Sequence, residues 1–122
     1  VAIGVVGLVM LLAPVAAPVL GGDAEHGEKV FAQCRACHVI DAAQNRVGPY
    51  LLGIIGRPAG SADGFRYSPA MANSGIVWTP ETLIQYLTNP KAFVPGNRMA
   101  FPGLRKPEDV ADIIAYLSAQ GS

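Results

Sequence analysis

The feature that most constrains this chain is a pair of cysteines two residues apart, followed at once by a histidine. The sequence Cys34-Arg35-Ala36-Cys37-His38 holds the only two cysteines of the chain. A disulfide across so short a loop is strained and reactive, a thioredoxin-like site requires a preceding strand, and a structural zinc site requires four ligands. Since CxxCH is the attachment signature of a covalent haem, we predict one haem c bound through Cys34 and Cys37.

The first twenty residues form a separate apolar segment. They contain no charged residue, whereas all nine basic and all nine acidic residues follow position 21. About 20 apolar residues can cross a bilayer, so residues 1–20 are either a retained membrane anchor in the form of a transmembrane helix, or a signal segment cleaved after export. We favour the anchor, because the sequence around Ala17 and Pro18 is a poor cleavage site. Both interpretations place a haem domain, residues 21–122, outside the cytoplasm.

Three segments of that domain predict its main helices. The first covers residues 24–36 and follows Asp23, a good N-cap. The others cover residues 80–89 and 107–120, and each opens on a proline at the first helical position. Apolar residues recur in them at helical spacing, and the chain has no convincing alternating strand pattern. The sequence therefore predicts an all-α domain.

The segments between these helices predict long loops. Residues 39–74 are rich in Gly, Pro, Ser and Asn and predict loops with a short helix near residues 68–74. Residues 91–106 predict a second long loop. Loops of this length are unusual in a compact domain unless something other than secondary structure fills its core. A haem would fill that role here.

A six-coordinate haem iron needs two axial ligands from the protein. His38 is fixed as one of them by the motif. His26 lies among acids in the first helix and is interpreted as a solvated surface histidine, Met10 lies in the apolar segment, and Met71 is interpreted as core or cavity lining. Met99 lies in a loop framed by Pro and Gly, which can present one thioether to the iron. We therefore predict His38 and Met99 as the iron ligands.

These motifs resemble those of the class I, mitochondrial-type cytochromes c, especially the short bacterial periplasmic carriers and their membrane-anchored relatives. The resemblance covers residues 22–120 and includes, besides the cysteine motif, residues 48–57, 64–68, 75–78 and 95–101. It implies the class I fold, in which three main helices, short helices and long loops surround one covalently bound haem. It also implies a location on the periplasmic side of a bacterial inner membrane.

The resemblance implies further residues around the iron ligands. Pro49 would accept a hydrogen bond from the His38 ring through its backbone carbonyl, as ligating histidines commonly require. Tyr86 would lie near the Met99 sulfur. Met71 stands where many family members have an asparagine, which puts their polar network in doubt for this chain.

The resemblance also implies residues around the rest of the haem. Arg57, Tyr67 and Trp78 would hydrogen-bond or neutralise the haem propionates, since buried carboxylates need donors and preferably a positive partner. Leu87 and Phe101 would contact the haem, with Phe101 at its exposed edge.

Charge and ligation together indicate the function. Net charge is zero, so no strong attraction to nucleic acid is evident. Six-coordinate iron leaves no open position for a substrate, so we expect an electron carrier rather than an enzyme, working between a quinol-oxidising cytochrome bc-type complex and a terminal oxidase or photosynthetic reaction centre. Two alternatives are a fixed subunit of a larger respiratory or photosynthetic complex and a peroxide- or gas-binding haem protein with a labile Met99.

The expected docking surface for redox partners is a basic cluster of four residues: Lys91, Arg98, Arg105 and Lys106.

Overall fold

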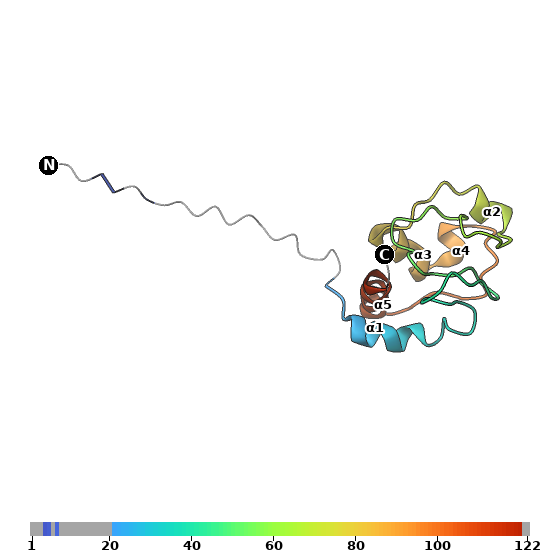
Figure 1. Ribbon diagram of the computed structural model, residues 1–122, viewed down its shortest axis with the longest axis horizontal. Coiled ribbons are helices and arrows are strands. Elements are labelled where there is room, and N and C mark those ends of the chain that lie inside the picture. Colours follow the sequence, from blue (N-terminus) through green and yellow to red (C-terminus); the bar gives the residue numbers. More distant parts are fainter. Residues whose placement is uncertain (1–3, 6, 8–20, 121–122) are drawn as a thin grey trace.

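The structure, a computed structural model, describes residues 4, 5, 7 and 21–120 (Figure 1). The helices of this part are, in chain order, α1 (Ala24–Phe31), α2 (Pro69–Ala72), α3 (Pro80–Thr88), α4 (Pro90–Phe93) and α5 (Pro107–Ala119). The expected anchor helix over residues 1–20 lies outside the described residues, apart from positions 4, 5 and 7. Among the helices that are described, none has the length and apolar character needed to span a membrane.

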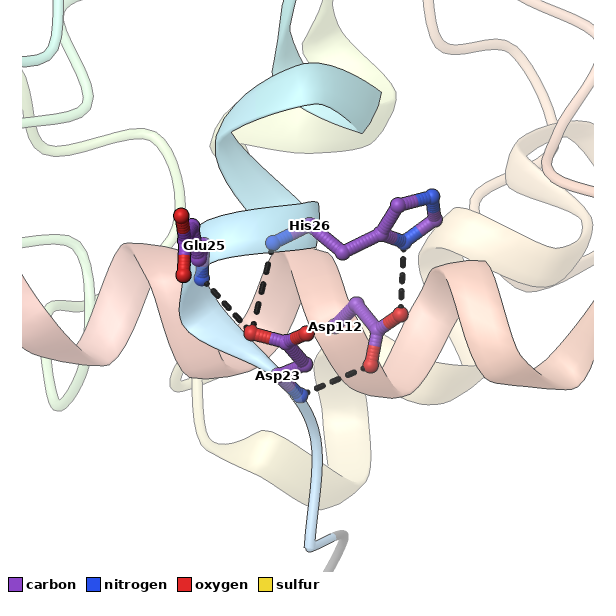
Figure 2. A network of polar contacts seen from close by, with 4 residues as sticks. All are labelled: Asp23, Glu25, His26 and Asp112. Carbon is purple, nitrogen blue, oxygen red and sulfur yellow. Dashed lines mark hydrogen bonds and ion pairs between the residues drawn. The ribbon is translucent and has the colours of Figure 1, made fainter.

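Polar contacts join the start of α1 to the middle of α5 (Figure 2). The Asp23 carboxylate caps α1 by accepting hydrogen bonds from the backbone N–H of Glu25 at 3.0 Å and of His26 at 3.3 Å. The Asp112 carboxylate accepts from the Asp23 backbone N–H at 2.8 Å and lies 2.7 Å from His26 Nδ1. The His26 ring is half-exposed, in agreement with its interpretation as a surface histidine, and its contact with Asp112 also links the two helices.

Below this polar end, α1 and α5 pack closely, and Figure 1 shows them side by side at one edge of the domain. Gly27 makes this approach possible, since any Cβ at that position would overlap the backbone carbonyl of Asp112. One turn further along α1, the ring of Phe31 lies 5.4 Å from the ring of Tyr116. The helix pair thus forms one buried side of the core.

The first helix is shorter than predicted, ending at Phe31 rather than at residue 36. Beyond it the backbone forms turns whose hydrogen bonds span three or four residues. The Phe31 carbonyl accepts from Cys34 N–H at 2.7 Å and from Arg35 N–H at 3.2 Å, and the Cys34 carbonyl accepts from Cys37 N–H at 3.1 Å and from His38 N–H at 3.0 Å. Such turns satisfy the carbonyls at a helix end. As a result both cysteines lie on turns, and His38 directly follows the last of them.

The third helix matches its prediction closely, with a reciprocal capping box between Thr79 and Thr82 at its start. The prediction of a continuous loop over residues 91–106 is wrong at its beginning, where α4 forms. The Asn89 side chain caps α4 by accepting from Ala92 N–H at 3.3 Å, and a proline follows at the first helical position. The asparagine and proline that end α3 therefore also begin α4.

Backbone hydrogen bonds join the middle loop to the segment between α2 and α3. Trp78 N–H donates to Arg57 O at 3.0 Å, Gly56 N–H donates to Trp78 O at 2.6 Å, and Pro58 forms an antiparallel bridge with Val77. No strand is assigned in the described part of the chain, which agrees with the all-α prediction. This pairing fixes the segments of Arg57 and Trp78 next to each other.

Candidate functional site

A cavity of about 410 Å³ occupies the centre of the domain. Its walls come from the turns after α1, from α3 and α5, and from the loops before α2 and after α4. Apolar side chains from widely separated segments form much of its lining, among them Phe31, Ile54, Leu83, Ile113 and Leu117. Every site residue predicted from the sequence also lines this cavity: Cys34, Cys37, His38, Pro49, Arg57, Tyr67, Trp78, Tyr86, Leu87, Met99 and Phe101.

The two cysteines lie on the turns that follow α1. Both are partly buried and neither forms a disulfide. Burial, with a smaller contribution from Cys37, raises the pKa of the Cys34 thiol to about 11. The two sulfur-bearing side chains therefore both line the cavity wall.

The His38 ring is held in one orientation by the backbone of the following loop. Its Nδ1 lies 2.7 Å from the carbonyl oxygen of Pro49, so the proton on Nδ1 donates to that carbonyl. Burial lowers the pKa of His38, and the Pro49 carbonyl partly opposes this effect. Gly48 packs on the ring so closely that any side chain there would overlap it. His38 is consequently a neutral imidazole whose Nε2 lone pair is available to a metal.

A thioether lines the same cavity from the loop after α4. The Tyr86 hydroxyl on α3 donates to the Met99 sulfur at a distance of 3.9 Å. Burial raises the pKa of Tyr86 to about 12, which keeps the phenol protonated at neutral pH. The centroids of the Tyr86 and Trp78 rings lie 4.9 Å apart, so packing against Trp78 also restricts the position of Tyr86.

The Arg57 guanidinium enters the cavity wall from the middle loop. It donates to the carbonyls of Tyr50 at 2.7 Å and Leu52 at 3.1 Å, and it lies 4.7 Å from the centre of the Tyr50 ring. Its Nε is buried and has no hydrogen-bond partner among the residues that the structure describes, an arrangement that is costly unless a ligand accepts from it. The Tyr67 hydroxyl accepts from Ala62 N–H at 3.0 Å, which leaves its own proton free to donate.

Four polar residues that line the cavity were not among the predicted site or docking residues: Gln33, Arg66, Ser68 and Asn97. Asn97 lines the cavity and bonds through its side chain to the backbone of Met99, Pro90 and Val94. An asparagine two residues before the expected ligand is a common turn residue, so its pattern gave no sign of this role. Met71 is buried and lines the cavity, in agreement with its interpretation as lining.

The residues present fit a haem. The cavity walls are mainly apolar, the two thiols lie together on one turn, and an imidazole nitrogen and a thioether sulfur come from separate segments. The unpartnered Nε of Arg57 offers a buried donor suited to an anionic group.

Comparison with known proteins decides the family. The sequence model of the family described as Cytochrome c matches residues 24–120, most of the chain. The chain belongs to the cytochrome c family. A cytochrome c type-1 of Ascaris suum is 51% identical over 100 residues, covering 81% of this chain and 89% of that protein. A cytochrome c2 of Blastochloris viridis is 48% identical over 122 residues, covering 97% of this chain and 95% of that protein.

A solved structure supports the same conclusion. Cytochrome cH from Methylobacterium extorquens superposes with a TM-score of 0.77 at 49% sequence identity, covering 81% of this chain and all of that chain. The predictions of the class I cytochrome c fold and of one haem c attached through Cys34 and Cys37 are confirmed. Like other cytochromes c, this one is an electron-transfer protein and not an enzyme.

Proposed function

We propose that this cytochrome c carries single electrons on the periplasmic side of a bacterial membrane, between a quinol-oxidising cytochrome bc-type complex and a terminal oxidase or photosynthetic reaction centre. The observation that carries the proposal is the supply of a neutral imidazole from His38 and a thioether from Met99 to one cavity. These are the donors of a His/Met-ligated haem, a ligation that raises the reduction potential. Two protein ligands would leave no open iron position for a substrate.

The chain's own residues would hold both ligands with little freedom to move. The Pro49 carbonyl and Gly48 fix the orientation of the His38 ring, and the Tyr86 hydroxyl lies at the Met99 sulfur. When bound, the haem supplies a one-electron iron couple. Ligands held in a mainly apolar, closely packed cavity would move little when the iron changes its oxidation state. Such small movement suits rapid electron transfer.

Polar residues on another part of the cavity would bind the haem propionates. Arg57 offers its unpartnered Nε and a positive charge, and Tyr67 offers its hydroxyl proton. Trp78 is joined to Arg57 through the backbone, and its indole N–H is a further donor. Leu87 and Phe101 line the cavity and would contact the ring itself.

The basic cluster would orient the protein toward its redox partners. Its members Lys91, Arg98, Arg105 and Lys106 are all exposed, and none forms an ion pair within the described residues. Arg98 and Phe101 also line the cavity, so the cluster adjoins the site. Exposed charge of one sign beside a redox site speeds the encounter with an acidic partner.

We also propose that residues 1–20 anchor the haem domain to the membrane. The segment is uncharged and long enough to span a bilayer. The test is intact mass combined with fractionation of the native host. Full-length chain plus haem in the membrane fraction supports the anchor, whereas a haem domain beginning near Gly21 in the soluble fraction contradicts it and supports a cleaved signal.

Absorption spectroscopy tests the axial ligands and the function together. The oxidised protein should show the weak band at the red end of the spectrum that reports a thioether–iron bond, and Met99→Ala should abolish it. The native reduced protein should not bind carbon monoxide rapidly. Rapid carbon monoxide binding, or a band that survives Met99→Ala, would contradict the assignment and favour a ligand-binding haem protein.

A further inference from the structure

The segment that carries Met99 has few backbone hydrogen bonds of its own. It is held at its ends, where Asn97 N–H donates to Val94 O at 3.0 Å and Leu104 N–H donates to Leu87 O at 2.8 Å. Within the described structure, no backbone group of residues 98–103 bonds to another backbone group. Something other than regular secondary structure must therefore fix the position of Met99.

The side chain of Asn97 provides this connection. Its Oδ1 accepts from the backbone N–H of Met99 at 3.0 Å. Its Nδ2 donates to the carbonyls of Pro90 and Val94, each at 3.0 Å. One amide thus joins Met99 to the first residue of α4 and to the residue that follows its last turn.

Only an amide of this length can make all three bonds at this position. The contacts need one acceptor and two donors on a short side chain, whereas a carboxylate has no donor and a hydroxyl has a single one. In the described part of the chain, no other side chain bonds to the backbone of residues 95–103. The role of Asn97 therefore has no substitute in the structure.

Met99 is consequently fixed at two points by different helices. The Asn97 amide ties its backbone to α4, and the Tyr86 hydroxyl contacts its sulfur from α3. These helices are consecutive and in contact, so the two attachments share one rigid support.

We propose that Asn97 is a positioning residue that holds the Met99 thioether in place for the haem iron and so sets how firmly the sixth coordination position is closed. This inference rests on the proposed ligation by Met99. Loss of the amide would leave the sulfur in the cavity but allow its segment to move, so that external ligands compete for the iron.

The test is imidazole binding to the oxidised, haem-loaded protein, recorded together with the thioether–iron band. In Asn97→Ala and in Asn97→Leu, which keeps the side-chain volume, the band should weaken. Imidazole should bind about tenfold more tightly than to the wild type, the order expected when hydrogen bonds to a mobile loop are lost. The matched control is Asn89→Ala, which removes the cap of the same helix without touching Met99 and should change imidazole affinity less than about twofold.

Three results would overturn the inference. If both Asn97 variants keep the full band and wild-type imidazole affinity, the residue is structural only. If Asn89→Ala loosens the iron ligand as much as they do, the effect belongs to α4 as a whole. If the wild type lacks the band, or Met99→Ala retains it, the ligand assignment fails and the role of Asn97 fails with it.

Amide hydrogen exchange in the wild-type holoprotein gives a readout that does not depend on any variant. The Met99 amide donates to Asn97, whereas the described structure gives the amides of Arg98 and Ala100 no acceptor. We expect the Met99 amide to exchange at least about tenfold more slowly than these two neighbours. Equal exchange at the three amides would show that the connection does not persist in solution.

Discussion

His26 on α1 and Asp112 on α5 are joined by a 2.7 Å contact between Nδ1 and Oδ2, although 86 positions separate them in the sequence. The same carboxylate accepts from the backbone N–H of Asp23 through its other oxygen. A single side chain thus connects two residues at the start of α1 to the middle of α5 (Figure 2). Its protonation state should therefore influence how firmly these helices hold together.

The first prediction concerns acid stability. The hydrogen bond from the Asp23 amide, and next the one from His26, hold the pKa of Asp112 below its usual range. The ionised Asp112 carboxylate therefore stabilises the folded protein fully above the pKa of an unfolded aspartate, about 3.9. This contribution is lost as the pH falls through the lower pKa that Asp112 has in the folded protein. Asp112→Asn should lower stability at neutral pH and remove this part of the acid dependence.

Denaturant unfolding followed by circular dichroism across this pH range would measure the effect. Asp41→Asn is the control, because Asp41 is exposed and its side chain accepts no hydrogen bond in the described structure. Equal stability of Asp112→Asn and the wild type at neutral pH would show that the contact contributes nothing.

The second prediction uses the close approach of α1 and α5. In an open helix, replacing glycine by alanine stabilises by about 1 kcal/mol. At Gly27 the new Cβ would overlap the Asp112 carbonyl and crowd the Cβ of Tyr116, so Gly27→Ala should instead destabilise by about 3 kcal/mol. Thermal or denaturant unfolding shows directly whether the variant is less or more stable than the wild type. A more stable variant would refute the close packing of α1 against α5.

The third prediction concerns the reduction potential. The Tyr86 hydroxyl donates to the Met99 sulfur and so withdraws electron density from it, which in the proposed His38/Met99 ligation favours the reduced iron. Tyr86→Phe should lower the potential by roughly 20–40 mV, the equivalent of about 0.5–1 kcal/mol for one weak hydrogen bond. Redox titration measures this shift.

Tyr116→Phe is the matched control for this experiment, because the Tyr116 hydroxyl accepts from Arg35 on the side of α1, away from Met99. It should leave the potential unchanged. A shift of the same size in both variants would mean that the effect does not arise at the sulfur.

The fourth prediction concerns the basic cluster. Electron-transfer rates with an acidic redox partner should fall as ionic strength rises. At 0.1 M salt, the attraction between exposed charges more than about 10 Å apart is largely screened. Replacing Arg105 and Lys106 by glutamate should slow the reaction at low salt and flatten its salt dependence. Stopped-flow kinetics would show this, with Lys29→Glu on α1 as a control outside the cluster; rates independent of salt would contradict the docking surface.

Local signals in the sequence predicted most of the fold. Helix starts were readable because Asp23 and Thr79 are strong caps and because prolines stand at the first helical positions. The end of α1 was not readable, because residues compatible with a helix, Ala32 and Gln33, continue past Phe31. Only the turns that hold Cys34 and Cys37 decide where the helix stops. The short α4 was missed because the residues that end α3 also begin it.

The site shows a similar division between local and distant information. The cysteine motif is contiguous, so its chemistry could be predicted from five residues. The role of Asn97 depends on which carbonyls lie opposite its amide, and the role of His26 depends on Asp112 far along the chain. Tertiary structure alone supplies the partner of His26, whereas the partners of Asn97 are brought to its amide by the local fold of α4 and the loop after it.

The packing of Gly27 against Asp112 has a consequence for the order of folding. This contact closes a loop that contains nearly all the walls of the central cavity, at an entropic cost of roughly 4 kcal/mol for a loop of this length. Little local structure within the loop can offset that cost in advance, since its helices are short and its longest segment is irregular. The meeting of α1 and α5 and the formation of the cavity should therefore be one cooperative event, in which neither forms stably before the other.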